Sequence, residues 1–429
     1  MTAEGSSDRI DRRTYVKLAG LVGSGAAASL TGYATQDQQW SNTLEVMHGW
    51  TGGDGAEALD ALVSAFDEEY PDIDHDFRAI GGTGNVNLDQ AVAQRLRDGD
   101  PPSSFAGWPG NNLVQYEGVL GDIEQDVWNE AGLVEAHAQE AVEACRFNGG
   151  FSAVPIGSHR MNDLFYNVEV LESAGVDPEG IDSFDAWVDA LDAVATETDA
   201  VPYANSLAPW VVLQFWAVIM LGTQGYDAYT NFINGEGDEG AVRASFENAQ
   251  TVLSEYLNQD APEIDFTEAN QAIMAGDAAF IHQGNWVAGA YVTEELTYGE
   301  DWGRIQFPGT EEMYTLHLDS FIYPGNQLDN PSPPESKAFL RFAGSEAAQV
   351  AFNQYKGSIP TREVPTDQFS QYLTETIEDF NSVDQRPPTI AHGLAVTQDV
   401  QSDLETALAD TFLDPYDVDA ATSRFMEIV

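Results

Sequence analysis

Short apolar segments alternate with amphipathic helical patterns near the start of this chain, and this alternation constrains the fold more than any other feature. In one helical pattern, Leu59, Leu62 and Phe66 recur three to four residues apart, which places them on one helix face. Strands are expected at 43–47, 74–80 and 104–107, and helices at 57–70 and 87–97. This order predicts an α/β fold with a mostly parallel sheet and helices on both of its faces.

The mixed pattern continues to the C-terminus. Further strands are expected at 153–156, 164–166 and 278–282, and further helices after Ser183 and at 210–221, 241–257, 267–275, 336–342 and 346–355. The apolar segment 210–221 is too short for a membrane span, which needs roughly 20 residues, and is expected to be a core helix. A chain of 429 residues is long enough for two or more lobes.

The charge of the chain is extreme. Asp and Glu number 71 against 17 Lys and Arg, which gives a net charge of −54. Such a surface repels itself in dilute buffer, whereas molar salt shortens the Debye length to roughly 3 Å and removes most of the repulsion. The composition therefore predicts adaptation to very high salt. With 43% hydrophobic residues the chain is not a disordered acidic polymer, and it has no basic patch for nucleic acid.

The N-terminus has the pattern of an export signal. Arg12 and Arg13 precede an apolar run at 18–30, and paired arginines in this position are typical of the twin-arginine route. We predict a twin-arginine signal at 1–35 and a polar linker at 36–42. The alternative is a basic N-terminal arm. The export signal is favoured because basic residues are rare in this chain, and yet four of the 17 fall before position 18, just ahead of the apolar run.

The end of this signal resembles a lipobox without its cysteine. The motif is Leu30-Thr31-Gly32-Tyr33, in which Tyr33 stands where the lipid-accepting cysteine would be. No thioether to a lipid can form there, so the exported protein is either released or held at the cell surface by an uncleaved N-terminus. Cys145 is the one cysteine, which excludes an internal disulfide.

The sequence lacks the motifs of common catalytic and metal sites. It has no Gly-Lys-Ser/Thr phosphate loop, no His-Glu-x-x-His pair and no Gly-x-Ser-x-Gly elbow. Seven scattered histidines and one cysteine make a zinc site improbable. A pair of hydrolytic carboxylates cannot be picked out among 71 acids. We therefore predict no catalytic residue, no metal and no cofactor.

Several short segments, in their order and spacing, resemble one family. They are Trp50-Thr51-Gly52-Gly53-Asp54, Gly99-Asp100-Pro101-Pro102, Val154-Pro155-Ile156 with His159-Arg160 and Asn162, Gly276-Asp277-Ala278-Ala279-Phe280 with Gly284-Asn285-Trp286, Asp319-Ser320-Phe321, Lys356-Gly357-Ser358-Ile359 and His392-Gly393. Over residues 43–395 the chain resembles the extracellular solute-binding proteins (family 1) of ABC sugar importers, most of all their glucose/galactose-binding members.

The resemblance implies a two-lobed, periplasmic-binding-protein-like (type II) α/β fold with a hinge and an interlobe cleft. Lobe 1 is expected to comprise 43–160 and 305–362, and lobe 2 to comprise 161–304 and 363–429. The implied function is capture of a monosaccharide, glucose or galactose first, for a membrane permease driven by its ATPase. The implied protein is a monomer and not an enzyme, and the charge points to a salt-loving archaeon.

The resemblance also implies a set of aromatic ligand contacts. Trp50 and Trp286 are predicted to stack on the apolar face of the sugar, the alternative being two core tryptophans. Trp108 stands where glucose-binding relatives have a histidine, so stacking is expected to replace a hydroxyl contact. Trp210 could either bind the ligand or pack in the core.

Polar contacts are implied at seven further positions. Lys356 is one of only three lysines, and its ammonium can donate to two hydroxyls. Asp319 is predicted to accept from hydroxyls, and the remaining candidates are Asp54, Glu57, Asn87, His159 and His392. For His159 the alternative is a structural role on the segment that crosses between lobes. For the carboxylates the alternative is that they are solvated on the surface and bind no ligand.

Three rival functions stay open at this point. The same fold could bind xylose, a disaccharide, an oligosaccharide, a polyol or glycerol phosphate. A phosphate would need a cluster of arginines, and only Arg160 and Arg362 lie near the motifs. A secreted glycoside hydrolase or an adhesive surface protein are rivals of other classes.

Overall fold

The computed structural model describes residues 43–52, 55–81, 85–325 and 333–429. The predicted export signal, the linker, Tyr33 and Asp54 lie outside these residues. No helix in the described ranges is long and apolar enough to cross a membrane. The expected core helix at 210–221 is found as α8 (Pro209–Gln224), whose residues from Val211 to Leu221 are all buried.

The first of two main sheets has five strands in the order β2-β1-β3-β11-β6. The strands are β1 (Leu44–His48), β2 (His75–Ala79), β3 (Ser104–Gly107), β6 (Ala153–Arg160) and β11 (Leu316–Ile322). β1 runs parallel to β2 and β3, as the alternation predicted, whereas β11 runs antiparallel to both β3 and β6. The late strand β11 therefore enters the sheet between two strands of the N-terminal segment.

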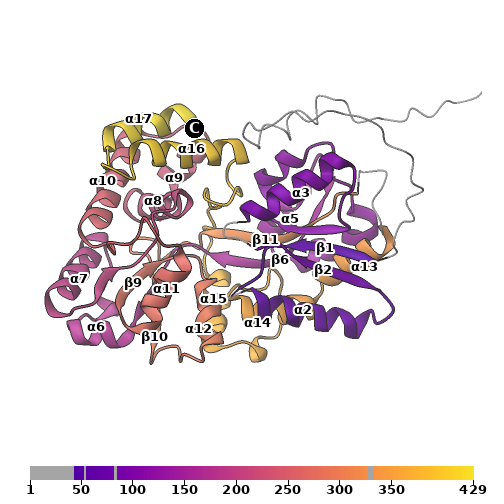
Figure 1. Cartoon of the computed structure of the whole chain (residues 1–429), viewed down its shortest axis with the longest axis horizontal. Helices are drawn as coiled ribbons and strands as arrows, with labels where there is room; N and C mark the ends of the chain where they lie inside the picture. The colour runs from indigo at the N-terminus through magenta and orange to yellow at the C-terminus, as the bar shows by residue number, and fades with distance from the viewer. Residues whose placement is uncertain (1–42, 53–54, 82–84, 326–332) are drawn as a thin grey trace, which may run out of the picture.

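Helices from the N-terminal part of the chain and two later helices at 333–356 cover this sheet (Figure 1). They are α2 (Ala56–Glu69), α3 (Val86–Asp98), α4 (Leu133–Ala136), α5 (Gln139–Ala144), α13 (Pro333–Ala343) and α14 (Glu346–Lys356), with shorter turns at Gly110–Tyr116 and Glu124–Asn129 and a hairpin of β4 (Arg146–Phe147) and β5 (Gly150–Phe151). Phe66 of the predicted apolar stripe is fully buried and contacts Phe339 and Phe342 of α13. The core thus joins segments far apart in sequence.

The second sheet has four strands in the order β10-β7-β9-β8. They are β7 (Asp163–Asn167), β8 (Val201–Tyr203), β9 (Ala278–His282) and β10 (Trp302–Gln306). The helices of this half are α6 (Val168–Ala174), α7 (Phe184–Glu197), α8, α9 (Tyr226–Ile233), α10 (Glu239–Glu255), α11 (Phe266–Ala275), α12 (Val287–Thr293), α15 (Gln371–Ser382), α16 (Gln398–Thr411) and α17 (Val418–Ile428). Ser183 caps α7 by accepting from the amide of Ala186, as predicted.

Figure 1 shows the two halves side by side, each with its own sheet and helices. The chain crosses from the first sheet to the second between β6 and β7, and returns between β10 and β11. The two-lobed α/β fold predicted from the sequence is therefore confirmed.

Four charged residues, two of them fully buried, meet where β6 leads into β7. Arg160 Nη1 donates to Asp379 Oδ2 at 2.6 Å, and Arg160 Nε lies 3.3 Å from Asp163 Oδ1. Arg304 of β10 reaches the same two carboxylates, at 3.4 Å from Asp163 and 2.5 Å from Asp379. Arg160 and Asp163 have no exposed side-chain surface. We call these four residues the crossing cluster, because they fasten the crossing segment to β10 and α15.

Candidate functional site

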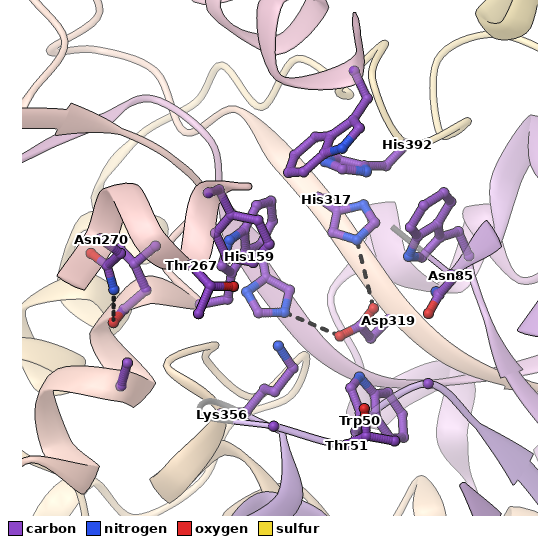
Figure 2. A pocket seen from close by; sticks show the side chains of 18 residues that line it. Trp50, Thr51, Asn85, His159, Thr267, Asn270, His317, Asp319, Lys356 and His392 are labelled. Atoms are coloured by element: carbon purple, nitrogen blue, oxygen red, sulfur yellow. Dashed lines mark hydrogen bonds and ion pairs between the residues drawn. The ribbon is translucent and has the colours of Figure 1, made fainter. Parts of the chain in front are cut away.

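A cavity of about 350 Å³ lies between the two halves (Figure 2). Its volume is near the lower end of the range for small-molecule sites, roughly 300–1,000 Å³. Both lobes contribute to its walls, which are formed by Gly49, Trp50, Thr51, Gly52, Asn85, Trp108, His159, Trp210, Phe266, Thr267, Asn270, Trp286, Val287, Ala290, His317, Asp319, Lys356 and His392. The cavity is therefore an interlobe cleft suited to a small ligand.

Aromatic rings form one side of the cleft. His392 lies at its centre, with ring centroids 4.9 Å from Trp108, 5.5 Å from Trp286 and 5.6 Å from Trp210. Trp108 and Trp286 are both buried, at 9% and 8% exposure. Flat apolar rings of this kind can pack on the C–H face of a pyranose.

Trp50 forms a separate part of the wall. It lies two residues after the end of β1 and is half-buried. Its edge packs on Phe321 and Phe352, with ring centroids 5.6 and 4.8 Å apart. The ring is thus held by the core of the first lobe while it borders the cleft.

Asp319 is the buried carboxylate of the site. Its Oδ2 lies 3.1 Å from His159 Nε2, and its Oδ1 lies 3.6 Å from His317 Nε2 (Figure 2). Burial alone would raise the pKa of this carboxyl, but the hydrogen bonds from His159 and His317 and the charge of Lys356 hold the pKa well below its ordinary value. Asp319 is therefore an ionised acceptor whose orientation is fixed by two imidazoles.

Lys356 brings the opposite charge to the cleft. It is the last residue of α14, is 5% exposed, and points into the cleft in Figure 2. Gly357 follows at φ +79°, and a Cβ there would stand 2.4 Å from the carbonyl oxygen of Asn285 in the other half. Glycine is required here because a side chain would separate the end of α14 from the segment before α12.

His159 links the two halves through its ring. Its Nδ1 lies 2.7 Å from Oδ1 of Asn285, while its Nε2 faces Asp319. The backbone amide of Asn285 donates to the carbonyl of Arg160 at 3.1 Å. Both roles weighed for His159 are thus present in its geometry, since it borders the cleft and also holds the crossing segment.

The structure brings eight of the eleven predicted residues together at the cleft: Trp50, Trp108, His159, Trp210, Trp286, Asp319, Lys356 and His392. Asp54 lies outside the described residues. Glu57 is exposed on α2 and does not line the cleft; its carboxylate accepts from the Thr293 hydroxyl at 3.4 Å. Asn87 is exposed as well, and its amide donates to the Gly81 carbonyl at 2.7 Å instead of reaching the cleft.

Five polar lining residues were not predicted as ligand contacts, and one of them, Thr51, directly follows the predicted Trp50. Asn85 lies two residues before Asn87 in a left-handed conformation, φ 58°, which positions its side chain beside Gly49. His317 is buried two residues before Asp319 on the same strand, so both share one face of β11. Thr267 and Asn270 are one turn apart on α11, and Asn270 accepts from the Tyr291 hydroxyl at 2.6 Å.

The side chains that line the cleft are suited to binding a small polar ligand. The cleft offers a fixed carboxylate, an ammonium, amides and aromatic faces, which together recognise hydroxyls and an apolar ring face. Within the described residues, no group of three or more His, Cys, Asp or Glu could hold a metal ion. The fold and the cleft therefore define a class of protein that encloses one small solute between two lobes.

Comparisons with known proteins agree with this class. A family model described as bacterial extracellular solute-binding protein matches residues 61–372. The xylose/arabinose-binding protein XacG of Haloferax volcanii is 45% identical over 399 residues, which cover 92% of this chain and 86% of that protein. An uncharacterised ABC transporter extracellular-binding protein of Pyrococcus horikoshii is 30% identical over 400 residues, 90% of this chain and 87% of that protein.

The fold also matches solved structures. The bacterial solute receptor AcbH, whose structure is described with an exclusive preference for β-D-galactopyranose, superposes with a TM-score of 0.78 at 16% identity. The match covers 90% of this chain and 97% of that chain. At this identity the match supports the fold alone.

This chain belongs to the family of bacterial extracellular solute-binding proteins. It is an exported binding protein and not an enzyme, so the family resemblance found in the sequence is confirmed and the hydrolase alternative was wrong.

Proposed function

We propose that this protein captures a monosaccharide and delivers it to the membrane permease of an ABC importer, whose ATPase drives uptake. The observation that carries the proposal is the cleft, where the ionised Asp319 and the ammonium of Lys356 lie within a wall of tryptophans. Relatives named as sugar-binding and ABC transporter proteins, which match about nine-tenths of the chain, support the same assignment.

An aldopentose such as xylose or arabinose is the first candidate ligand. The support is the 45% identity to a relative named for these two sugars. A cavity of about 350 Å³ can enclose one monosaccharide, either a pentopyranose or a hexopyranose. Glucose and galactose, expected from the sequence motifs, are the second candidates.

A glycerol phosphate is disfavoured by the position of the arginines. Arg160 is neutralised by Asp163 and Asp379, and Arg362 donates to the Gly344 carbonyl at 2.9 Å. Neither lines the cleft, where Lys356 is the one lysine or arginine among the described lining residues. A dianionic phosphate needs more compensation than one ammonium supplies.

Thermal unfolding of the mature chain with a panel of sugars tests the function. In molar potassium chloride, a ligand at a hundredfold excess over its Kd should stabilise the folded protein by about 2.7 kcal/mol. We expect xylose or arabinose to raise the Tm most, and glucose or galactose to raise it less. A larger shift with glucose or galactose would overturn the pentose assignment. No shift with any sugar, in protein shown to be folded, would overturn the sugar assignment.

We also propose that the chain acts as a monomer and is exported by the twin-arginine route. The support for the route is the Arg12-Arg13 pair ahead of the apolar run at 18–30. Replacing both arginines with lysine, which keeps the charge, should leave the full-length protein inside the cell. Continued secretion of that variant would show that another route carries it.

A further inference from the structure

Helix α8 contains one polar residue that its surroundings do not explain. Every residue from Val211 to Leu221 is buried, and Gln214 is the single polar side chain among them, with 2% exposure. A buried amide is unfavourable unless its hydrogen bonds are satisfied. In the described part of the chain the amide nitrogen of Gln214 has no partner. An apolar side chain of the same length would suit this helix better, so folding alone does not account for glutamine.

Among the described residues, the amide oxygen of Gln214 has one hydrogen-bond partner, and this partner lines the cleft. Gln214 Oε1 lies 3.2 Å from Nε2 of His392, a residue that lines the cleft and is 4% exposed. With the amide oxygen of Gln214 placed as the acceptor of this contact, Nε2 of His392 carries the hydrogen. In a neutral imidazole the other nitrogen, Nδ1, is then a bare acceptor.

The surroundings of His392 leave this acceptor unused by the protein. Its Nδ1 has no hydrogen-bond partner within the described residues, although the ring is packed against Trp108 at 4.9 Å and His317 at 4.7 Å. Burial, together with the neighbouring His317 and His159, holds the pKa of His392 well below its ordinary value, so the ring is neutral.

We propose that Gln214 is a positioning residue that fixes the ring and tautomer of His392, so that Nδ1, which is buried in the ligand-free cleft, becomes the acceptor for a hydroxyl of the ligand when the lobes close around it. The inference rests on the proposed function, because it assigns a hydroxyl-bearing ligand to the same cleft. In this proposal His392 and the carboxylate of Asp319 both accept hydrogen bonds from the ligand, and the ammonium of Lys356 donates to it. All three residues line the cleft (Figure 2). Gln214 itself does not line the cleft and acts through the imidazole.

Histidine ring NMR of the ligand-free protein tests the positioning role without any sugar. With ¹⁵N-labelled histidine, the wild-type His392 signal, identified by its absence in His392→Ala, should be that of a neutral ring protonated at Nε2. In Gln214→Met the same ring should show a mixture of tautomers. Gln224→Met, the same substitution in the last turn of α8 and away from the cleft, should leave the signal unchanged.

Sugar titration of the same variants tests the consequence for binding. Gln214→Met should bind the sugar about tenfold more weakly, the loss of one neutral hydrogen bond, while the Tm of the ligand-free protein stays equal or rises. In a His392→Ala background the substitution should have no further effect on affinity, because its route to the ligand is gone. Gln224→Met should bind as the wild type does.

The outcomes separate this inference from the proposed function. A wild-type protein that binds no sugar contradicts the proposed function, and the tautomer comparison still decides whether Gln214 orients His392. An unchanged His392 signal in Gln214→Met overturns the positioning role. An equal loss of affinity with and without His392 overturns it too, because Gln214 would then act on the fold and not through the imidazole.

Discussion

Replacing Asp319 with asparagine should weaken sugar binding by about a hundredfold. A hydroxyl bonded to a charged group contributes about 1.5–3 kcal/mol, against about 0.5–1.5 kcal/mol for a neutral pair, and the carboxylate can serve two hydroxyls. Asparagine also places an amide N–H against the ring nitrogens of His159 and His317, which both face Asp319 now. The loss should be measured by calorimetric titration in molar salt, with unfolding curves recorded in parallel.

An exposed aspartate gives the matched control. Asp403 on α16 is solvent-exposed and does not line the cleft, so Asp403→Asn removes the same charge without changing the walls of the cleft. It should bind sugar as tightly as the wild type. If Asp319→Asn stays folded and binds within about threefold of the wild type, Asp319 does not contact the ligand.

The sequence was sufficient to predict the elements that depend on local periodicity. The strands expected at 104–107 and 278–282 are β3 and β9 with the same bounds, and the apolar segment 210–221 is the core of α8. In each case the apolar residues of one short segment are enough to predict the element, because the faces that are buried determine how often apolar residues recur.

Elements that depend on distant partners were not predicted. β11 pairs with β3 and β6, about 160 residues or more away, and nothing within Leu316–Ile322 identifies these partners. Without that strand, the shared face of His317 and Asp319 could not be recognised, although the two-residue spacing was visible in the sequence. The family motifs located Asp319 and missed its neighbour for this reason.

Errors at the cleft itself came from local backbone geometry. Asn87 was predicted as a ligand contact and Asn85 was not, but Asn85 takes the left-handed conformation just before α3 and lines the cleft, while the amide of Asn87 donates to the Gly81 carbonyl. A two-residue change at a helix start reverses the direction of a side chain. Gln214 was overlooked because a single amide does not disturb the apolar pattern of α8.

Replacing Asp163 with alanine should lower the free energy of unfolding by about 3–5 kcal/mol, since it breaks a buried ion pair and leaves uncompensated charge. Asp163 is fully buried and lies within 3.4 Å of both Arg160 and Arg304. Without it, two guanidinium groups of the crossing cluster share Asp379 alone. The effect should be measured by urea unfolding in molar potassium chloride, because urea does not change the ionic strength.

The salt dependence of this loss distinguishes the crossing cluster from the acidic surface. Buried charges are screened much less than exposed ones, so the deficit of Asp163→Ala should persist as potassium chloride is raised. Asp419→Ala is the control, since it removes the exposed partner of Arg243 and should change stability little in molar salt. The opposite result is that both substitutions lower the free energy of unfolding by less than about 1 kcal/mol and that salt abolishes the loss. The crossing cluster would then be solvated and would not stabilise the crossing segment. A persistent loss confined to Asp163→Ala means that the crossing segment of this highly acidic protein is stabilised by ion pairs that added salt does not weaken.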